Sequence, residues 1–170
     1  MVILFSGRKN PVEREIISIL TSYGADYISD KRVYAGDGPF TIISEYKKTD
    51  INVKSGVAVF IDDTDRFEGQ VFPNGITGVC EDINQKALEI FRESNIPVIS
   101  CGMNAKNTVT LSSLNSPTLL ASLQRTVTDK RGRSVEPCEF KIRPCKKYST
   151  FAVTASVAVL LLHGIIPDKF

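Results

Sequence analysis

The chain has 170 residues, close to the roughly 100–150 residues of an ordinary domain, so one domain covering 1–170 is expected. Hydrophobic residues make up 42% and charged residues 24%, which excludes a mostly disordered chain and a membrane protein with many spans. The net charge is only +2 and there is a single histidine, which argues against a dedicated nucleic-acid-binding domain and excludes a three-histidine zinc site.

The first 24 residues predict a strand, a short polar loop and a helix. Val2–Phe5 is an apolar run of the kind that forms a buried strand, and Gly7 follows it closely. Asn10 can cap a helix whose first residue is proline, and Glu13 lies at the capping-box position. Gly24 ends this helix, because glycine is the favoured residue just beyond a last helical turn.

Strands then dominate as far as Gly102. They are predicted at 26–34, 40–44, 57–61, 76–80 and 97–100, with a turn at 36–39. A second helix is predicted at 83–94 with Asp82 as its cap. This order is typical of an α/β fold, in which ligands gather at the carboxyl ends of the parallel strands. That edge is expected to carry residues 6–10, Glu45, 62–65 and 101–106.

The pattern changes after Gly102. Apolar and polar residues alternate in 108–112, 119–124 and 138–143, which predicts antiparallel strands with a hairpin turn at 129–133. The last helix is predicted at 149–163. The uncharged segment 151–166 would span roughly 24 Å as a helix, less than the ~30 Å hydrocarbon core of a bilayer. A core helix is therefore favoured, and a C-terminal membrane anchor is the alternative.

The four cysteines indicate a reducing compartment. Cys80, Cys101, Cys138 and Cys145 form no C-x-x-C pair of the kind found in zinc and redox sites. The apolar run at the N-terminus is too short for the apolar region of a signal peptide. Reduced cysteines in a cytoplasmic protein are expected.

The loop after the first strand is the candidate anion-binding or phosphate-binding site. It lies before a helix N-terminus, where free N–H groups and the helix dipole favour an anion, and Arg8 and Lys9 add two cations. The loop lacks the second glycine and the Ser/Thr of the G-x-x-x-x-G-K-[ST] phosphate loop. An ordinary turn with exposed charges is the alternative. The candidate residues are Ser6, Gly7, Arg8, Lys9 and Asn10.

Two further charged features have a functional and an ordinary interpretation. Glu45, Asp62 and Asp63 lie at the carboxyl ends of two predicted strands and are candidate ligands for a hard cation such as Mg²⁺, or else solvated loop residues. The segment 125–147 holds eight basic and three acidic residues, a local charge of +5. It is either a contact for an anionic partner or a solvated hairpin.

The order of elements resembles the central, ATP-binding domain of the Mur ligase family, the ATP-dependent amide-bond formers of cell-wall precursor synthesis. Residues 57–63 (VAVFIDD) are similar to the family's strand that ends in an N-x-D-D run, and 96–102 (IPVISCG) to the strand that follows it. Residues 149–165 (STFAVTASVAVLLLHGI) resemble the alanine-rich helix that ends in Gly-Ile. More weakly, 3–24 resembles the family's strand, phosphate loop and first helix, and Glu45 lies near its metal-binding glutamate.

The resemblance implies a Rossmann-like, three-layer α/β fold in a bacterial protein. It comprises a mostly parallel sheet (1–102), a small antiparallel β subsheet near the C-terminus (103–147) and a closing C-terminal helix (148–166). The chain departs from the family at the nucleotide site. The phosphate loop is shorter and degenerate, and the asparagines that open the family's alanine-rich helix fall near Tyr148 and Ala152. The family's metal-site histidine has no counterpart here.

These departures predict a shortened, non-catalytic Mur-ligase-like domain that binds a protein partner or a small anionic or nucleotide ligand. Two alternatives remain. The first is an atypical ATP-using or phosphate-using enzyme of the amide-ligase type, with ATP and Mg²⁺ as cofactors. The second is a tail-anchored or membrane-peripheral protein. No nucleic-acid or membrane partner is expected, and oligomerisation is left open.

Overall fold

Ten strands form one mixed sheet among residues 1–112 and 118–169, which are the residues that the computed structural model describes. The strand order is β12-β9-β8-β7-β6-β5-β1-β4-β2-β3, and the run from β8 to β2 is parallel throughout. Pairs β2–β3, β8–β9 and β9–β12 are antiparallel. The strands are β1 (Val2–Phe5), β2 (Asp26–Ile28), β3 (Val33–Tyr34), β4 (Thr41–Glu45), β5 (Gly56–Phe60), β6 (Ile76–Glu81), β7 (Val98–Gly102), β8 (Val109–Leu111), β9 (Leu119–Leu123) and β12 (Cys138–Ile142).

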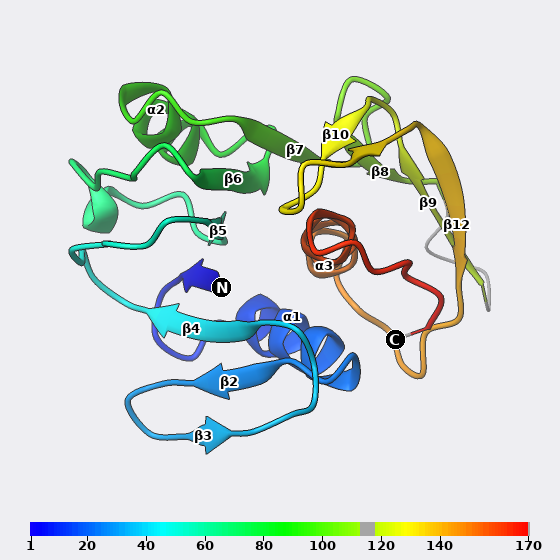
Figure 1. Cartoon of the computed structure of the whole chain (residues 1–170), viewed down its shortest axis with the longest axis horizontal. Helices are drawn as coiled ribbons and strands as arrows, with labels where there is room; N and C mark the ends of the chain where they lie inside the picture. Colours follow the sequence, from blue (N-terminus) through cyan, green and yellow to red (C-terminus); the bar gives the residue numbers. More distant parts are fainter. Residues whose placement is uncertain (113–117, 170) are drawn as a thin grey trace.

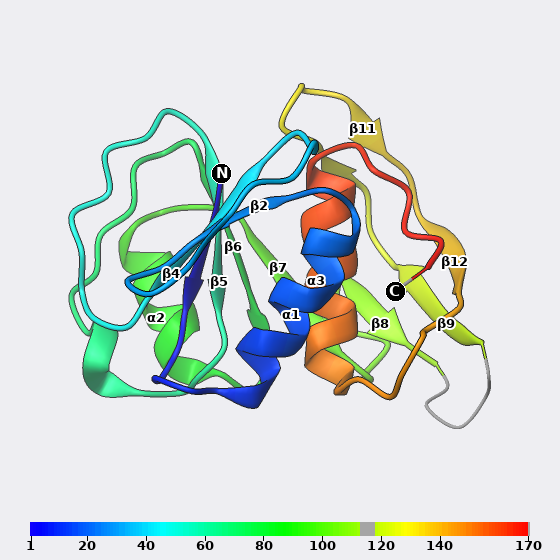
Figure 2. The ribbon, with the colours of Figure 1, turned by 90° about the horizontal axis from the view of Figure 1, so that it is seen from below.

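Helices cover both faces of this sheet, which confirms the three-layer α/β prediction. In Figure 1 the strands form an arc around α3 (Thr150–Leu162), with α1 (Pro11–Ser22) on the same side. Figure 2 shows α1 and α3 side by side, with α2 (Gln85–Glu93) across the sheet. The two faces enclose separate apolar clusters. One cluster contains α1 and α3, and the other contains α2 and the rings of Phe60 and Phe67.

Helix α3 is the core helix that the sequence favoured. Every side chain from Phe151 to Leu162 is buried, as expected for a helix that is apolar on all sides. Its N-cap, Ser149, donates from both its N–H and its hydroxyl to Glu15 Oε2 of α1, at 2.8 and 2.6 Å. Gly164 follows with a positive φ of 72°. Among the described residues, no helix has the length and apolar character needed to cross a membrane.

The C-terminal antiparallel strands extend the main sheet, and a small hairpin projects from them. The hairpin pairs β10 (Val127–Thr128) with β11 (Ser134–Val135) around the predicted turn. Two of its basic side chains, Arg133 and Lys130, make contacts within the protein. Arg133 Nη2 lies 2.7 Å from Asp129 Oδ2, and Lys130 Nζ donates to Thr77 Oγ1 at 2.9 Å. Burial lowers the pKa of Lys130 to about 8.

Two local predictions were wrong. The predicted strand at 26–34 is two short strands, because Ser29 and Arg32 close a turn in which the Ser29 N–H donates to the Arg32 carbonyl at 2.8 Å. Helix α2 is capped by Asn84, whose Oδ1 accepts from the Ala87 N–H at 2.9 Å. The Asp82 carboxylate instead accepts from Asn107 Nδ2 at 3.0 Å. The Ser29–Arg32 turn and the Asn84 cap are local contacts, whereas the contact that engages Asp82 joins residues 25 positions apart.

The contact between Ser149 and Glu15 gives a stability prediction. We expect Ser149→Ala to lower the free energy of unfolding by about 1–3 kcal/mol, because it removes both a helix cap and a hydrogen bond to a carboxylate. Urea unfolding measures this, with Ser55→Ala at an exposed position as the matched control. Equal effects of the two substitutions would contradict the role assigned to Ser149.

Candidate functional site

The loop between β1 and α1 is tightly turned. The Asn10 N–H donates to the Gly7 carbonyl at 3.2 Å, and Lys9 has a φ of 65°, in the left-handed region that few non-glycine residues adopt. Asn10 caps α1 as predicted, since its Oδ1 accepts from the Val12 N–H at 2.8 Å. The loop is therefore held in one conformation by its own backbone and by the helix cap.

Asp62 fills the position that an anion would take in this loop. It comes two residues after β5, the neighbour of β1 in the sheet. Its Oδ2 accepts the Gly7 N–H, and its Oδ1 accepts from the Asn10 side-chain amide. A Cβ at position 7 would lie 2.9 Å from Asp62 Oδ2, so only glycine allows this approach. The loop's anion-binding groups are thus used by a carboxylate of the chain itself.

The five predicted anion-binding residues separate into two groups. Gly7 and Asn10 bind Asp62. Ser6 is buried, and its N–H donates to the Glu45 carbonyl at 3.2 Å, so it joins two strand ends. Arg8 and Lys9 are exposed and line a neighbouring cavity. The structure therefore does not direct all five residues at one ligand.

The three predicted metal ligands lie in three different surroundings. Asp62 is bound to the loop, and Asp63 Oδ1 accepts from the Lys86 N–H at 3.3 Å. Glu45 lines a hollow of about 580 Å³ beyond Tyr46, where burial raises its pKa. No group of three or more His, Cys, Asp or Glu side chains is positioned to bind a metal ion within residues 1–112 and 118–169. The sheet brings the three residues to one edge without converging their carboxylates.

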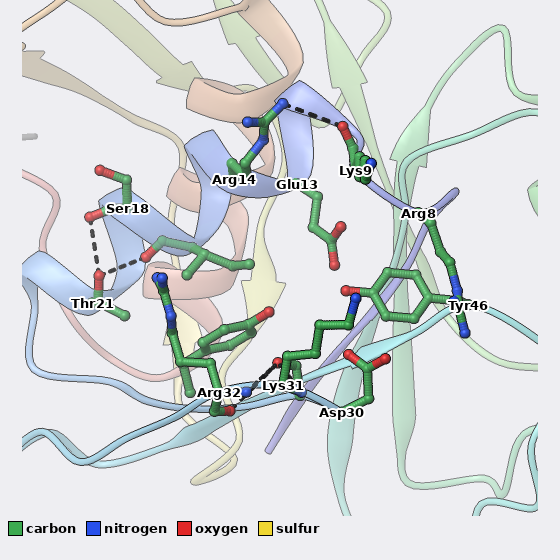
Figure 3. A pocket seen from close by; sticks show the side chains of 13 residues that line it. Arg8, Lys9, Glu13, Arg14, Ser18, Thr21, Asp30, Lys31, Arg32 and Tyr46 are labelled. Carbon is green, nitrogen blue, oxygen red and sulfur yellow. Dashed lines mark hydrogen bonds between the residues drawn. The ribbon is translucent and has the colours of Figure 1, made fainter.

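A cavity of about 560 Å³ lies beside the loop, between α1 and the turn that joins β2 to β3. Five basic side chains line it, and Figure 3 shows them on two sides. Arg14 and Lys9 lie on the side of α1, and Lys31 and Arg32 lie on the side of the β2–β3 turn. Arg8 stacks over the ring of Tyr46, with 5.9 Å between its Cζ and the ring centroid.

The floor of this cavity carries a buried acid. Glu13 is only 3% exposed, and its Oε1 has no hydrogen-bond partner in the described part of the chain. Figure 3 shows its carboxyl group pointing from α1 into the cavity toward Tyr46. Burial raises the pKa of Glu13, and the hydroxyls of Ser44, Ser6 and Tyr46 partly offset this rise. Burial, followed by the charge of Glu13, raises the pKa of Tyr46 to about 12, so its phenol stays a neutral donor.

Sequence reasoning missed this cavity because it assigned Glu13 to a capping box. The side chain instead turns inward beneath the cations. The basic pair Lys31-Arg32 was a visible signal, but it lay inside a predicted continuous strand. Only the sheet order, which places β2 beyond β4 and over α1, brings this pair opposite Arg14.

The fold is similar to that of two solved structures of Mur ligases. The chain aligns with MurF from Acinetobacter baumannii at a TM-score of 0.55 and 10% identity, over 97% of this chain and 43% of that one. It aligns with the murein peptide ligase Mpl from Psychrobacter arcticus 273-4 at a TM-score of 0.58 and 9% identity, over 98% of this chain and 45% of that one. No protein-family model and no curated protein matches it. The chain therefore has a Mur-ligase-like fold and spans less than half the length of these two proteins.

The Asp62 contact can be tested through stability. We expect Asp62→Ala to lower the free energy of unfolding by about 1–3 kcal/mol, because it leaves the Gly7 N–H and the Asn10 amide without their charged acceptor. Urea unfolding measures this. Asp50→Ala, at an exposed position outside the loop, should change stability by only about 0.5 kcal/mol or less. A cost for Asp62→Ala as small as that control's would contradict the contact.

The buried Glu13 gives a pH-dependent prediction. Its folded-state pKa is raised, so it contributes stability at low pH that is lost as pH rises from about 4.5 through the folded pKa. Glu13→Gln cannot titrate and should remove this loss. We expect the stability of the variant relative to the wild type to increase between pH 4.5 and pH 7.5 in urea unfolding. The exposed Glu89→Gln serves as the control, and a pH-independent difference for Glu13→Gln would contradict the assignment.

Proposed function

We propose that the chain is a shortened, non-catalytic Mur-ligase-like domain of a bacterial, cytoplasmic protein, and that it binds a small anionic ligand. The observation that carries the proposal is the Asp62 carboxylate bound at the Gly7 N–H and the Asn10 amide. A carboxylate at this place competes with a nucleotide phosphate for the same donors and repels its charge. The two cations of the loop, Arg8 and Lys9, line the neighbouring cavity instead.

ATP with Mg²⁺ does not fit the residues at this loop. The loop has neither the glycine-lysine pair nor the hydroxyl residue that hold phosphate and magnesium in a phosphate loop. Glu45 lines a separate hollow, Asp63 accepts from the Lys86 N–H, and Asp62 would have to leave its two donors before it could bind a cation. An ATP-using enzyme of the amide-ligase type is the alternative, and it requires that rearrangement.

The cavity favours a small ligand over a protein partner. A concave site of about 560 Å³ is within the ~300–1,000 Å³ range of small-molecule sites, and its lining combines cations with an acid of which one oxygen lacks a hydrogen-bond partner. The cytoplasmic setting is supported by the cysteines. Cys80, Cys101, Cys138 and Cys145 are all free, and the first two are buried.

The test is phosphate release from Mg-ATP by the purified chain. We expect none above the protein-free background, whereas a working enzyme with a typical turnover of about 10 s⁻¹ would be detected at once. An Arg8→Ala, Lys9→Ala double variant controls for contaminating ATPases. Phosphate release that is present in the wild type and lost in this variant would overturn the proposal.

A further inference from the structure

The cations around the cavity come from two walls that face each other. Arg14 belongs to the first turn of α1 and Lys9 to the loop before it, whereas Lys31 and Arg32 belong to the turn between β2 and β3. Among the described residues, the ion pairs are Lys86–Asp65 and Arg133–Asp129. None of the four cations of the cavity walls is therefore paired with a carboxylate there. Arg14 Nη2 donates to a neutral group, the Lys9 carbonyl, at 3.3 Å. Two separated positive walls fit a ligand with two anionic groups better than one with a single anionic group.

The charge of the cavity also exceeds what one phosphate would neutralise. The lining holds Arg8, Lys9, Arg14, Lys31 and Arg32 against Asp30 and Glu13. This leaves a surplus of three positive charges with Glu13 ionised, and a phosphate monoester carries at most about two negative charges near neutral pH. Guanidinium groups bind phosphate with paired N–H donors, and the cavity presents three of them.

The floor of the cavity, at Glu13, suits a hydroxyl group of a ligand and not a phosphate. Glu13 Oε1 is buried and unpartnered, and leaving such an acceptor unsatisfied costs about 1–3 kcal/mol. The Tyr27 hydroxyl also lines the cavity and lies 3.2 Å from Ser44 Oγ, so this side of the cavity carries a hydroxyl group as well as the Glu13 carboxyl group. A carboxylate at this depth would repel a phosphate, but it would accept a hydrogen bond from a ligand hydroxyl.

We propose that the cavity between α1 and the β2–β3 turn binds a small molecule that has two phosphate groups on a hydroxyl-bearing skeleton, with one phosphate at each wall and a hydroxyl donating to Glu13. This inference rests on the proposed function and names the ligand class of that domain. A sugar bisphosphate and a nucleoside diphosphate share this chemistry. The cavity volume of about 560 Å³ accommodates ligands of that size.

Calorimetric titration of the full chain at constant ionic strength tests the two-wall arrangement. The probes are inorganic phosphate and pyrophosphate, and pyrophosphate should bind about tenfold more tightly. Arg14→Ala on one wall and Arg32→Ala on the other should each weaken pyrophosphate binding about tenfold. Arg131→Ala, at an exposed position in the basic hairpin, is the matched control and should change it less than about twofold. Equal affinities for the two probes, or equal losses in Arg14→Ala and Arg131→Ala, would overturn the proposal.

The skeleton is tested with fructose 1,6-bisphosphate and ADP. At least one of them should bind more tightly than pyrophosphate, and the tighter one identifies a sugar bisphosphate or a nucleoside diphosphate as the source. Glu13→Gln should reduce that advantage about fivefold and should not weaken pyrophosphate binding, because it weakens the hydroxyl contact and removes a negative charge. If neither compound binds more tightly than pyrophosphate, the proposal fails. That failure is distinguishable from failure of the proposed function, which would appear as phosphate release from Mg-ATP.

Discussion

The contact between Asp62 and the turn before α1 is the constraint on which the site depends. Parallel pairing of β1 with β5 brings the residues after these strands to one edge, and the glycine at position 7 lets the carboxylate reach the backbone N–H. The same carboxylate holds Asn10, which caps α1. One acidic side chain thus fixes the loop and occupies the place where an anion would bind at a helix N-terminus.

The Asp62 contact leaves the two cations of the loop to act outside it. With the donors of the loop engaged, Arg8 and Lys9 line the cavity beside it, where the β2–β3 turn supplies further cations. The wall of α1 is itself held from behind by α3, which is buried on all sides and joined to α1 through Glu15. The buried helix α3 thus supports α1, and α1 forms one wall of the cationic cavity. The anion-binding role is proposed for this cavity.

Much of the fold could be predicted from the sequence because it is encoded locally. The apolar run at Val2–Phe5, the Asn10 cap and the glycine after α3 each specify an element within a few residues, and the structure has all three. The site could not be predicted in this way. The inward turn of Glu13 and the position of Lys31 opposite Arg14 depend on the sheet order, which no short pattern in the chain encodes. The Asp62 contact joins residues 55 positions apart, so the loop and the acidic residues were interpreted as two candidate sites although they satisfy each other.

The most direct test of the central claim is to observe backbone amides by NMR while pyrophosphate is added. Because Asp62 already binds the Gly7 N–H, the account predicts that the Gly7 resonance stays in place. The amides of Arg14, Lys31 and Arg32 should instead shift together and saturate with one affinity. A dominant shift at Gly7 and Asn10, with no change at the β2–β3 turn, would show that the loop itself binds the anion and would contradict the account.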